Sequence, residues 1–309
     1  MAAAAVVRPA ALRARMWKHR AVYAIVALPL AYFIIFRYLP LWTAQIAFKD
    51  FSPLDGVLRS RWIGFTHFLT FFHSIYFGQL IRNTLFYSFM KLVVGLPAAM
   101  LLALALSETG SRGMRSIVQT VSYLPHFLSW VIMYGVLLAL LSPGEGLVND
   151  IIKAGGGQPV SFFTSPQWFP AIVILSDAWK EVGWSAIIFL AALIGIDPAL
   201  YEAAAVEGAS RFQRIWHITL PNVLDVVVIV TLLRLGAILD AGFHQIFVLY
   251  SLPVYSVADI LDTWVYRQGV LEFQFSLATA VGLFKGAIGL VLVFAANRMT
   301  RRLAGAGLY

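Results

Sequence analysis

Charged side chains interrupt the apolar segments of this chain, and they are the residues best suited to contact a polar ligand. A charge among apolar residues is unfavourable unless it faces protein, water or an ionic partner. Two interpretations stay open. The charges can hold helices together, as Asp177 and Lys180 could at i,i+3 spacing. Alternatively, Lys180 and Arg234, joined by Lys91 or Lys285, can line a polar path and meet a carboxylated sugar there. The full set is Arg37, Lys91, Asp177, Lys180, Glu181, Asp225, Arg234 and Lys285.

Aromatic side chains close to these charges are compatible with a sugar ligand. Trp179, Trp184, Phe243 and Phe247 could stack their flat rings on the apolar C–H face of a sugar, although ordinary packing explains them as well. The candidate translocation path therefore comprises Lys180, Arg234, Trp179, Trp184, Phe243 and His244.

Motifs for covalent chemistry and metal binding are missing from the sequence. It has no G-x-x-x-x-G-K-[ST] phosphate loop and no H-E-x-x-H pair, and Gly183-Trp184-Ser185 lacks the spacing of a nucleophile elbow. There is no cysteine, which excludes disulfides and thiolate metal sites. His67 and His73 are better explained as solvated or capping residues than as ligands. We predict neither an enzyme nor a metal site.

Composition predicts an all-α integral membrane protein. Hydrophobic residues make up 60% of the chain and charged residues 12%, more apolar side chain than a soluble domain can bury. A net charge of +8 could indicate nucleic-acid binding, but the basic residues flank apolar segments instead of forming a basic face with stacking aromatics. Hydropathy predicts six transmembrane helices near residues 22–46, 80–106, 117–141, 169–194, 218–239 and 276–296, with outside loops at 48–78, 142–168 and 240–275.

Lysine and arginine predict the orientation of these spans. If both termini are cytoplasmic, the inner side holds the larger share of basic residues, as the positive-inside rule requires. The inner residues are Arg8, Arg13, Arg15, Lys18, Arg20, Arg112, Arg115, Arg211, Arg214, Arg298, Arg301 and Arg302, and the fewer outer ones are Lys49, Arg59, Arg61, Arg82, Lys153 and Arg267. Residues 1–20 would form a basic cytoplasmic tail, and residues 21–309 the six-span domain.

A polar helical segment separates the fourth and fifth predicted spans, at residues 201–221. Asp197-Pro198 is a favourable helix start, because the carboxylate can cap free amides and proline fits the first helical position. Three consecutive alanines then leave a smooth surface beside Glu202, and Gly208 allows the helix to break. Such a segment between membrane spans is typical of a docking element.

The residues Glu202-Ala203-Ala204, Gly208, Ile218 and Leu220-Pro221 match, at family spacing, the EAA loop of binding-protein-dependent ABC importers. The stretches 122–135, 177–193 and 242–269 resemble the first permease of oligosaccharide importers, above all those of the alginate and pectin type. His244 departs from the acidic or amide residue expected at its position in relatives, which leaves the identity of the sugar open.

This resemblance implies a type I ABC importer permease of the bacterial inner membrane, with the EAA loop as a cytoplasmic coupling helix. It also implies the partners: a homologous second permease, two ATP-binding cassette subunits that hold ATP and Mg, an extracytoplasmic solute-binding protein, an oligosaccharide, and membrane lipid. This chain would bind no cofactor and no nucleic acid. The alternatives are a permease for another solute, such as an amino acid, phosphate or neutral sugar, and a membrane receptor or scaffold.

Overall fold

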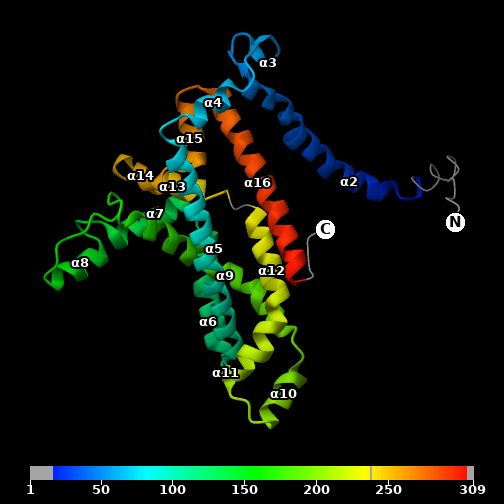
Figure 1. The fold of residues 1–309 in the computed structure, drawn as a ribbon. Helices are drawn as coiled ribbons and strands as arrows, with labels where there is room; N and C mark the ends of the chain where they lie inside the picture. The colour runs from blue at the N-terminus through cyan, green and yellow to red at the C-terminus, as the bar shows by residue number, and fades with distance from the viewer. Residues whose placement is uncertain (1–16, 237–238, 305–309) are drawn as a thin grey trace.

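The structure, a computed structural model, describes residues 17–236 and 239–304, and most of these residues are helical (Figure 1). Two very short strands, β1 (Lys49–Asp50) and β2 (Arg61–Trp62), pair antiparallel with Lys49 opposite Trp62. The prediction of an all-α protein is confirmed. Most of the basic tail predicted for residues 1–20 lies outside the described residues.

Among residues 17–236 and 239–304, four helical segments are long and apolar enough to cross a bilayer, judged by length and composition. They are α2 (Arg20–Phe33) with η1 (Ile34–Tyr38) and η2 (Leu39–Phe48), α5 (Phe77–Glu108), α11 (Arg211–Arg214) with η4 (Ile215–Thr219) and α12 (Leu220–Gly236), and α16 (Phe275–Ala304).

Two bent pairs of helices also pass this test when each pair is taken together. Helix α6 (Arg112–Tyr123) and η3 (Leu124–Phe127) meet α7 (Trp130–Leu141) at 112°, and α9 (Phe169–Ile194) meets α10 (Pro198–Val206) at 68°. The described part of the chain therefore holds four to six candidate spans. The predicted number of six stays a prediction.

The outside loops predicted from sequence contain short helices. These are α3 (Gly56–Arg59), α4 (Thr66–Phe72), α8 (Leu147–Ala154), α13 (Phe243–Leu249), η5 (Leu252–Val254), α14 (Tyr255–Ala258), α15 (Leu261–Tyr266) and η6 (Arg267–Leu271).

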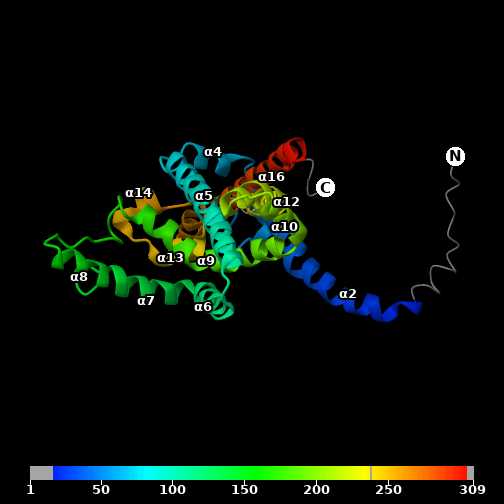
Figure 2. The same cartoon turned by 90° about the horizontal axis from the view of Figure 1, so that it is seen from below.

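Helix α2 stands apart from the other helices in both views (Figures 1 and 2). None of its residues is buried, although its sequence is almost entirely apolar. Apolar surface of this extent is unfavourable in water. Lipid or another protein chain must therefore cover it.

Helices α5, α9 and α12 form the main core. Buried Ala99, Ala103, Phe189 and Val223 belong to one apolar cluster along these three helices. Small residues let helices approach closely. At Gly183 of α9 the approach is so close that a Cβ atom would lie 2.0 Å from the carbonyl oxygen of Ser122, near the end of α6.

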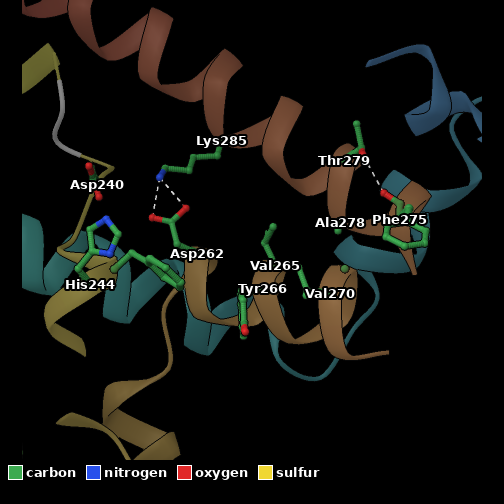
Figure 3. Close-up of a pocket in the computed structure, with 12 residues that line it drawn as sticks. Asp240, His244, Asp262, Val265, Tyr266, Val270, Phe275, Ala278, Thr279 and Lys285 are labelled. Carbon is green, nitrogen blue, oxygen red and sulfur yellow. Dashed lines mark hydrogen bonds and ion pairs between the residues drawn. The ribbon is translucent and has the colours of Figure 1, made fainter. Parts of the chain in front are cut away.

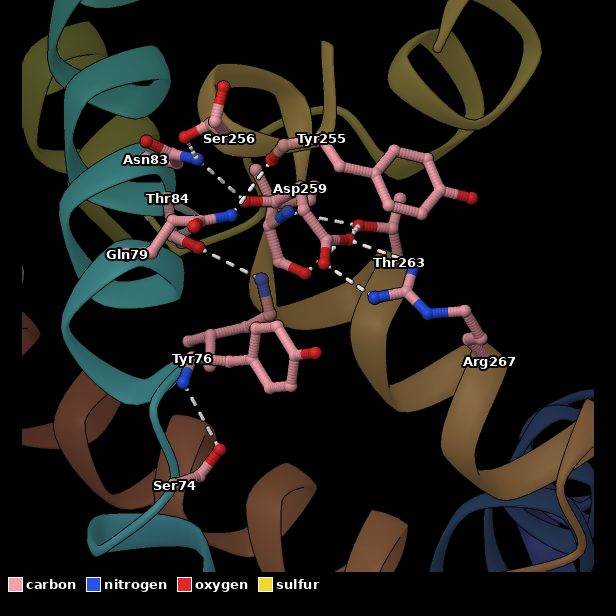
Figure 4. A network of polar contacts seen from close by, with 12 residues as sticks. Ser74, Tyr76, Gln79, Asn83, Thr84, Tyr255, Ser256, Asp259, Thr263 and Arg267 are labelled. Carbon is pink, nitrogen blue, oxygen red and sulfur yellow. Dashed lines mark hydrogen bonds and ion pairs between the residues drawn. The ribbon is translucent and has the colours of Figure 1, made fainter. Parts of the chain in front are cut away.

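An ion pair braces the segment between α14 and η6, and hydrogen bonds from α5 hold that segment in place (Figure 4). Asp259 is 2% exposed, and the Arg267 guanidinium donates to its two carboxylate oxygens at 2.5 and 3.3 Å. From α5, the Asn83 side chain donates to the carbonyl of Asp259 at 3.0 Å, and the hydroxyl of Thr84 accepts from the amide of Leu261 at 3.0 Å. Paired and hydrogen-bonded in this way, the buried charges are compensated.

Candidate functional site

A cavity of about 280 Å³ lies where α5, α9 and α12 meet the segment that follows α12. We call it the charged cavity. Cations and carboxylates face each other in its wall. Its lining comprises Ser88, Lys91, Leu92, Asp177, Glu181, Arg234, Asp240 and Gly242.

Lys91 is the best-connected cation of the charged cavity. Its ammonium lies 3.1 Å from the Asp177 carboxylate and donates to the carbonyl of Ala241 at 3.0 Å and to the side-chain oxygen of Gln245 at 2.5 Å. Gly242 makes this approach possible. It has a φ of +90°, and a Cβ atom there would lie 2.3 Å from the Lys91 nitrogen.

Arg234 is the other cation of the charged cavity and has fewer partners. Its guanidinium donates to the hydroxyl of Ser185 at 2.6 Å. Within the described residues, no carboxylate lies within ion-pair distance of it. Its remaining donors suit a carboxylate ligand, which a guanidinium can bind with two parallel hydrogen bonds.

A second, larger cavity of about 640 Å³ lies between α13, α15, η6 and α16 (Figure 3). We call it the aromatic cavity. Rings of Phe243, Tyr266 and Phe275 line it together with the polar groups of Asp240, His244, Asp262, Thr279 and Lys285.

An ion pair forms part of the wall of the aromatic cavity. The Lys285 ammonium donates to both carboxylate oxygens of Asp262 at 2.7 Å. Burial raises the pKa of the Asp262 carboxyl above its ordinary value, although the hydrogen bond and charge of Lys285 act to lower it.

Asp240 connects the two cavities. It lines the charged cavity on one side and the aromatic cavity on the other. Its carboxylate makes no ion pair within 4 Å of a described cation. The two cavities therefore share a polar group able to accept hydrogen bonds from a ligand in either of them.

Lys180 lies in neither cavity. It is buried, and its ammonium donates to the carbonyls of Pro125, His126 and Leu128 at 3.2, 2.5 and 2.8 Å. These carbonyls lie at the sharp bend between η3 and α7, where the helical hydrogen bonds are interrupted. The pairing of Lys180 with Asp177 considered from the sequence is wrong, because Asp177 pairs with Lys91.

The two tryptophans of the candidate path lie in different surroundings. Trp179 lines an apolar groove of about 330 Å³ with Leu137, Trp168 and Leu175. Trp184 stacks on the imidazole of His126. Phe243 and His244 line the aromatic cavity, and Arg234 the charged one, so the structure distributes the six path residues over several places.

The segment proposed for coupling forms two short helices joined by a tight turn. The Asp197 carboxylate caps α10 by accepting from the amide of Ala199 at 2.9 Å, and Gly208, with a φ of +82°, lies in the turn before α11. Glu202 and Ala203 are exposed. Ala204, Gly208 and Ile218 line a depression of about 370 Å³ between α10 and η4. Leu220 and Pro221 begin α12.

Some residues that line these cavities were not part of the translocation path predicted from the sequence. Asp177 and Glu181 were considered only as charges within spans, and Lys91 only as an addition to a path lined by Lys180 and Arg234. Asp240, Asp262 and Tyr266 were not singled out. Asp240 and Asp262 follow the fifth predicted span within ordinary-looking loop sequence. Only the fold places Asp240 between the two cavities and brings Asp262 beside α16. Within the part of the chain that the structure describes, no group of histidine and acidic side chains could hold a metal ion.

Comparison with known proteins agrees with the resemblance found in the sequence. The family model described as "Binding-protein-dependent transport system inner membrane component" matches residues 95–305. The chain is 42% identical to the polygalacturonan/rhamnogalacturonan transport system permease protein YteP of Bacillus subtilis, over 90% of this chain and 87% of that protein. It is 40% identical to protein LplB of the same organism, over 97% of this chain and 93% of that protein.

Solved structures show the same fold. A chain of a bacterial ABC transporter involved in the import of the acidic polysaccharide alginate superposes with a TM-score of 0.88 at 42% identity, covering 95% of this chain and 99% of that chain. A chain of a bacterial alginate ABC transporter in complex with an alginate pentasaccharide-bound periplasmic protein also gives 0.88, at 40% identity, covering 95% and 98%.

Proposed function

The chain belongs to the family of binding-protein-dependent transport system inner membrane components, and we propose that its two cavities form part of the path of an importer for carboxylated oligosaccharides. It is a permease subunit of a sugar-importing ABC transporter and not an enzyme.

One observation carries the proposed path: charged and aromatic side chains line two cavities that share Asp240, in a chain whose candidate membrane spans are mostly apolar. Charges inside a membrane protein are retained where water, protein or a ligand meets them. Sugars bind through hydrogen bonds to their hydroxyls and through contact of their C–H faces with flat rings. The charged cavity offers the first kind of contact and the aromatic cavity offers both.

The carboxylated nature of the sugar is supported by the relatives and by Arg234. Polygalacturonan is a polymer of sugar acids, and alginate is named as an acidic polysaccharide. Arg234 has free donors beside the charged cavity and no carboxylate partner among the described residues. We expect it to bind a sugar carboxylate during passage.

A neutral sugar is the second candidate, and the balance of charge in the same cavity favours it. Three carboxylates, those of Asp177, Glu181 and Asp240, line the charged cavity against two cations, Lys91 and Arg234. Carboxylates accept hydrogen bonds from sugar hydroxyls but repel sugar carboxylates. The two candidates differ in their dependence on Arg234.

Coupling to ATP would pass through α10 and the depression beside it. The sequence lacks a phosphate loop, so ATP and Mg would bind to two partner ATPase subunits that Glu202, Ala203, Ala204, Gly208, Ile218, Leu220 and Pro221 contact or support. A second, homologous permease and lipid would cover apolar surfaces such as that of α2. An external binding protein would deliver the sugar, with both termini of this chain in the cytoplasm. Transport would then be a two-state change biased by these partners.

ATP-dependent uptake into proteoliposomes that contain the complete complex tests this function. Tetragalacturonate and maltotetraose supply a charged and a neutral oligosaccharide of equal length, each presented with a binding protein that holds it. Arg234→Met should lower tetragalacturonate uptake about five-fold to a hundred-fold more than maltotetraose uptake, which corresponds to about 1–3 kcal/mol for a charged contact. Lys153→Met, which removes an exposed cation on α8, is the control. Equal losses for both sugars would contradict the carboxylate contact, and absence of any sugar uptake by the unmodified complex would contradict the function.

A further inference from the structure

A parallel stack of two rings lies beside the bend between η3 and α7. The imidazole of His126 and the indole of Trp184 have centroids 4.6 Å apart and an angle of 1° between their planes. Phe127 meets Trp184 edge-on at 5.8 Å. One face of the Trp184 indole is therefore covered by His126, and the residue is still 44% exposed.

Glu181 joins this stack to the charged cavity. Its carboxylate lies 2.9 Å from Nδ1 of His126 and also lines the charged cavity. On α9, residues four and seven positions after Asp177 return to the same face of the helix, because a turn takes 3.6 residues. Asp177, Glu181 and Trp184 therefore form one stripe that continues from the cavity to the ring stack.

Lys180 holds the bend that carries His126. Its ammonium binds the carbonyl of His126 and those of two neighbouring residues, and it lies 5.7 Å from the centre of the Trp130 ring. A fixed backbone at this bend keeps the imidazole between Glu181 and Trp184. Lys180 is thus a positioning residue for the stack.

We propose that Trp184, Glu181 and His126 bind one pyranose ring of the transported oligosaccharide, next to the charged cavity. This inference rests on the proposed function. The exposed part of the indole contacts the C–H face of the ring, and a ring hydroxyl donates to the Glu181 carboxylate. A partly exposed flat ring beside a carboxylate supplies both contacts that a pyranose needs, whereas the groove around Trp179 is almost purely apolar.

Trp179 provides a matched control, because it lines neither the charged cavity nor the aromatic cavity and so lies outside the path proposed from them. It lies on the same helix as Trp184 and is 45% exposed, against 44% for Trp184. A leucine at either position removes a flat ring of equal size from α9. General damage to the helix or to its contacts with other chains would affect both variants, whereas loss of sugar stacking would affect one.

The test compares Trp184→Leu, Trp184→Phe and Trp179→Leu in the complete complex, with tetragalacturonate uptake and ATPase stimulation by the loaded binding protein as readouts. We expect Trp184→Leu to lower uptake about ten-fold or more and Trp184→Phe, which keeps a flat ring, by no more than about three-fold. Trp179→Leu should stay within about two-fold of the unmodified complex. ATPase stimulation should persist in all three variants, because the binding protein still docks.

Uptake by Trp184→Leu within two-fold of the unmodified complex would overturn the proposal, as would an equal loss in Trp179→Leu. If Trp184→Leu does not assemble, Glu181→Gln decides: a loss of about five-fold in an assembled complex supports the sugar contact, and unchanged uptake overturns it. Uptake by the unmodified complex separates this proposal from the function it rests on, because a failure of that function would abolish uptake in every variant and control.

Discussion

The carboxylate of Asp177 on α9 lies 3.1 Å from the ammonium of Lys91 on α5, a residue 86 positions earlier in the chain. Spacing along α9 favours Lys180 as the partner of Asp177, because residues three apart are neighbours on a helix surface. In the structure, Lys180 instead donates to the carbonyls at the η3–α7 bend, and Asp177 pairs with Lys91 across the interface between α9 and α5. The contact joins α5 and α9, two of the three helices that line the charged cavity.

Removal of the Lys91 charge should destabilise the permease. Lys91→Met leaves Asp177, the Gln245 oxygen and the Ala241 carbonyl without their donor, and an unpaired, mostly buried carboxylate costs about 3–5 kcal/mol. We expect the melting temperature of the purified permease complex to fall by about 5 °C or more. Lys153→Met, which breaks an exposed pair with Asp150, should change it by no more than about 1 °C. Similar shifts for both variants would contradict a special role of Lys91.

Loss of Lys180 should lower the transport of charged and neutral sugars equally. In Lys180→Met three carbonyls at the bend lose a donor, and each unsatisfied buried group costs about 1–3 kcal/mol. This outcome differs from that of Arg234→Met, for which we expect a larger loss with the carboxylated sugar. Uptake of tetragalacturonate and maltotetraose by the two variants checks both expectations. A selective loss of tetragalacturonate uptake in Lys180→Met would contradict this expectation and indicate that Lys180 contacts the sugar carboxylate.

Local sequence signals predicted the helices well, because their causes are local. The Asp197-Pro198 start and the Gly208 break of the polar segment both occur as expected, through a side-chain cap and a left-handed glycine. The apolar segments likewise became the long helices α5, α12 and α16. The bend of 112° at residues 128–129 was missed, because the hydropathy of the segment is continuous across it. Pro125, just before the bend, was the local signal that could have indicated it.

The pairing of charges could not be predicted, because it depends on which helices pack together. Lys285 pairs with Asp262, and Lys91 with Asp177, only where α16 packs on α15 and α5 on α9. Nothing in the local spacing distinguishes Lys91, which faces a cavity, from Lys180, which supports the backbone. The same holds for His126, whose stacking on Trp184 joins residues 58 positions apart.

Topology should follow the distribution of lysine and arginine. Reporter fusions after Arg112, Gly208 and Arg302 should indicate the cytoplasm, and fusions near Asp55, Gly156 and Asp259 the outside, because basic residues are retained on the inner side. A pair of reporters, one active only in the cytoplasm and one only outside, provides the measurement. An outside signal at Gly208 would contradict both the orientation and the coupling role of α10.

The turn at Gly208 should be essential for coupling, and Gly156 is its matched control. Both glycines have a positive φ, +82° and +81°, and a Cβ atom at either position would meet nothing within 4 Å. A glutamate at either position therefore carries the same backbone strain, added bulk and negative charge, but only the residue at position 208 lies beside the depression between α10 and η4. We expect Gly208→Glu to abolish uptake while the permease still inserts, and Gly156→Glu to retain most of it.

Glu202→Lys tests the same contact without any change to the backbone. Glu202 is exposed on α10, and reversal of its charge should repel the surface that it meets on the ATPase. Sugar-stimulated ATPase activity and uptake should then be lost together, with normal amounts of permease in the membrane. Gly208→Asn separates strain from contact, because asparagine tolerates a positive φ and adds no charge. It should retain more uptake than Gly208→Glu. If Glu202→Lys and Gly208→Glu both transport normally with normal ATPase stimulation, then α10 is a linker between helices and the ATPase docks elsewhere.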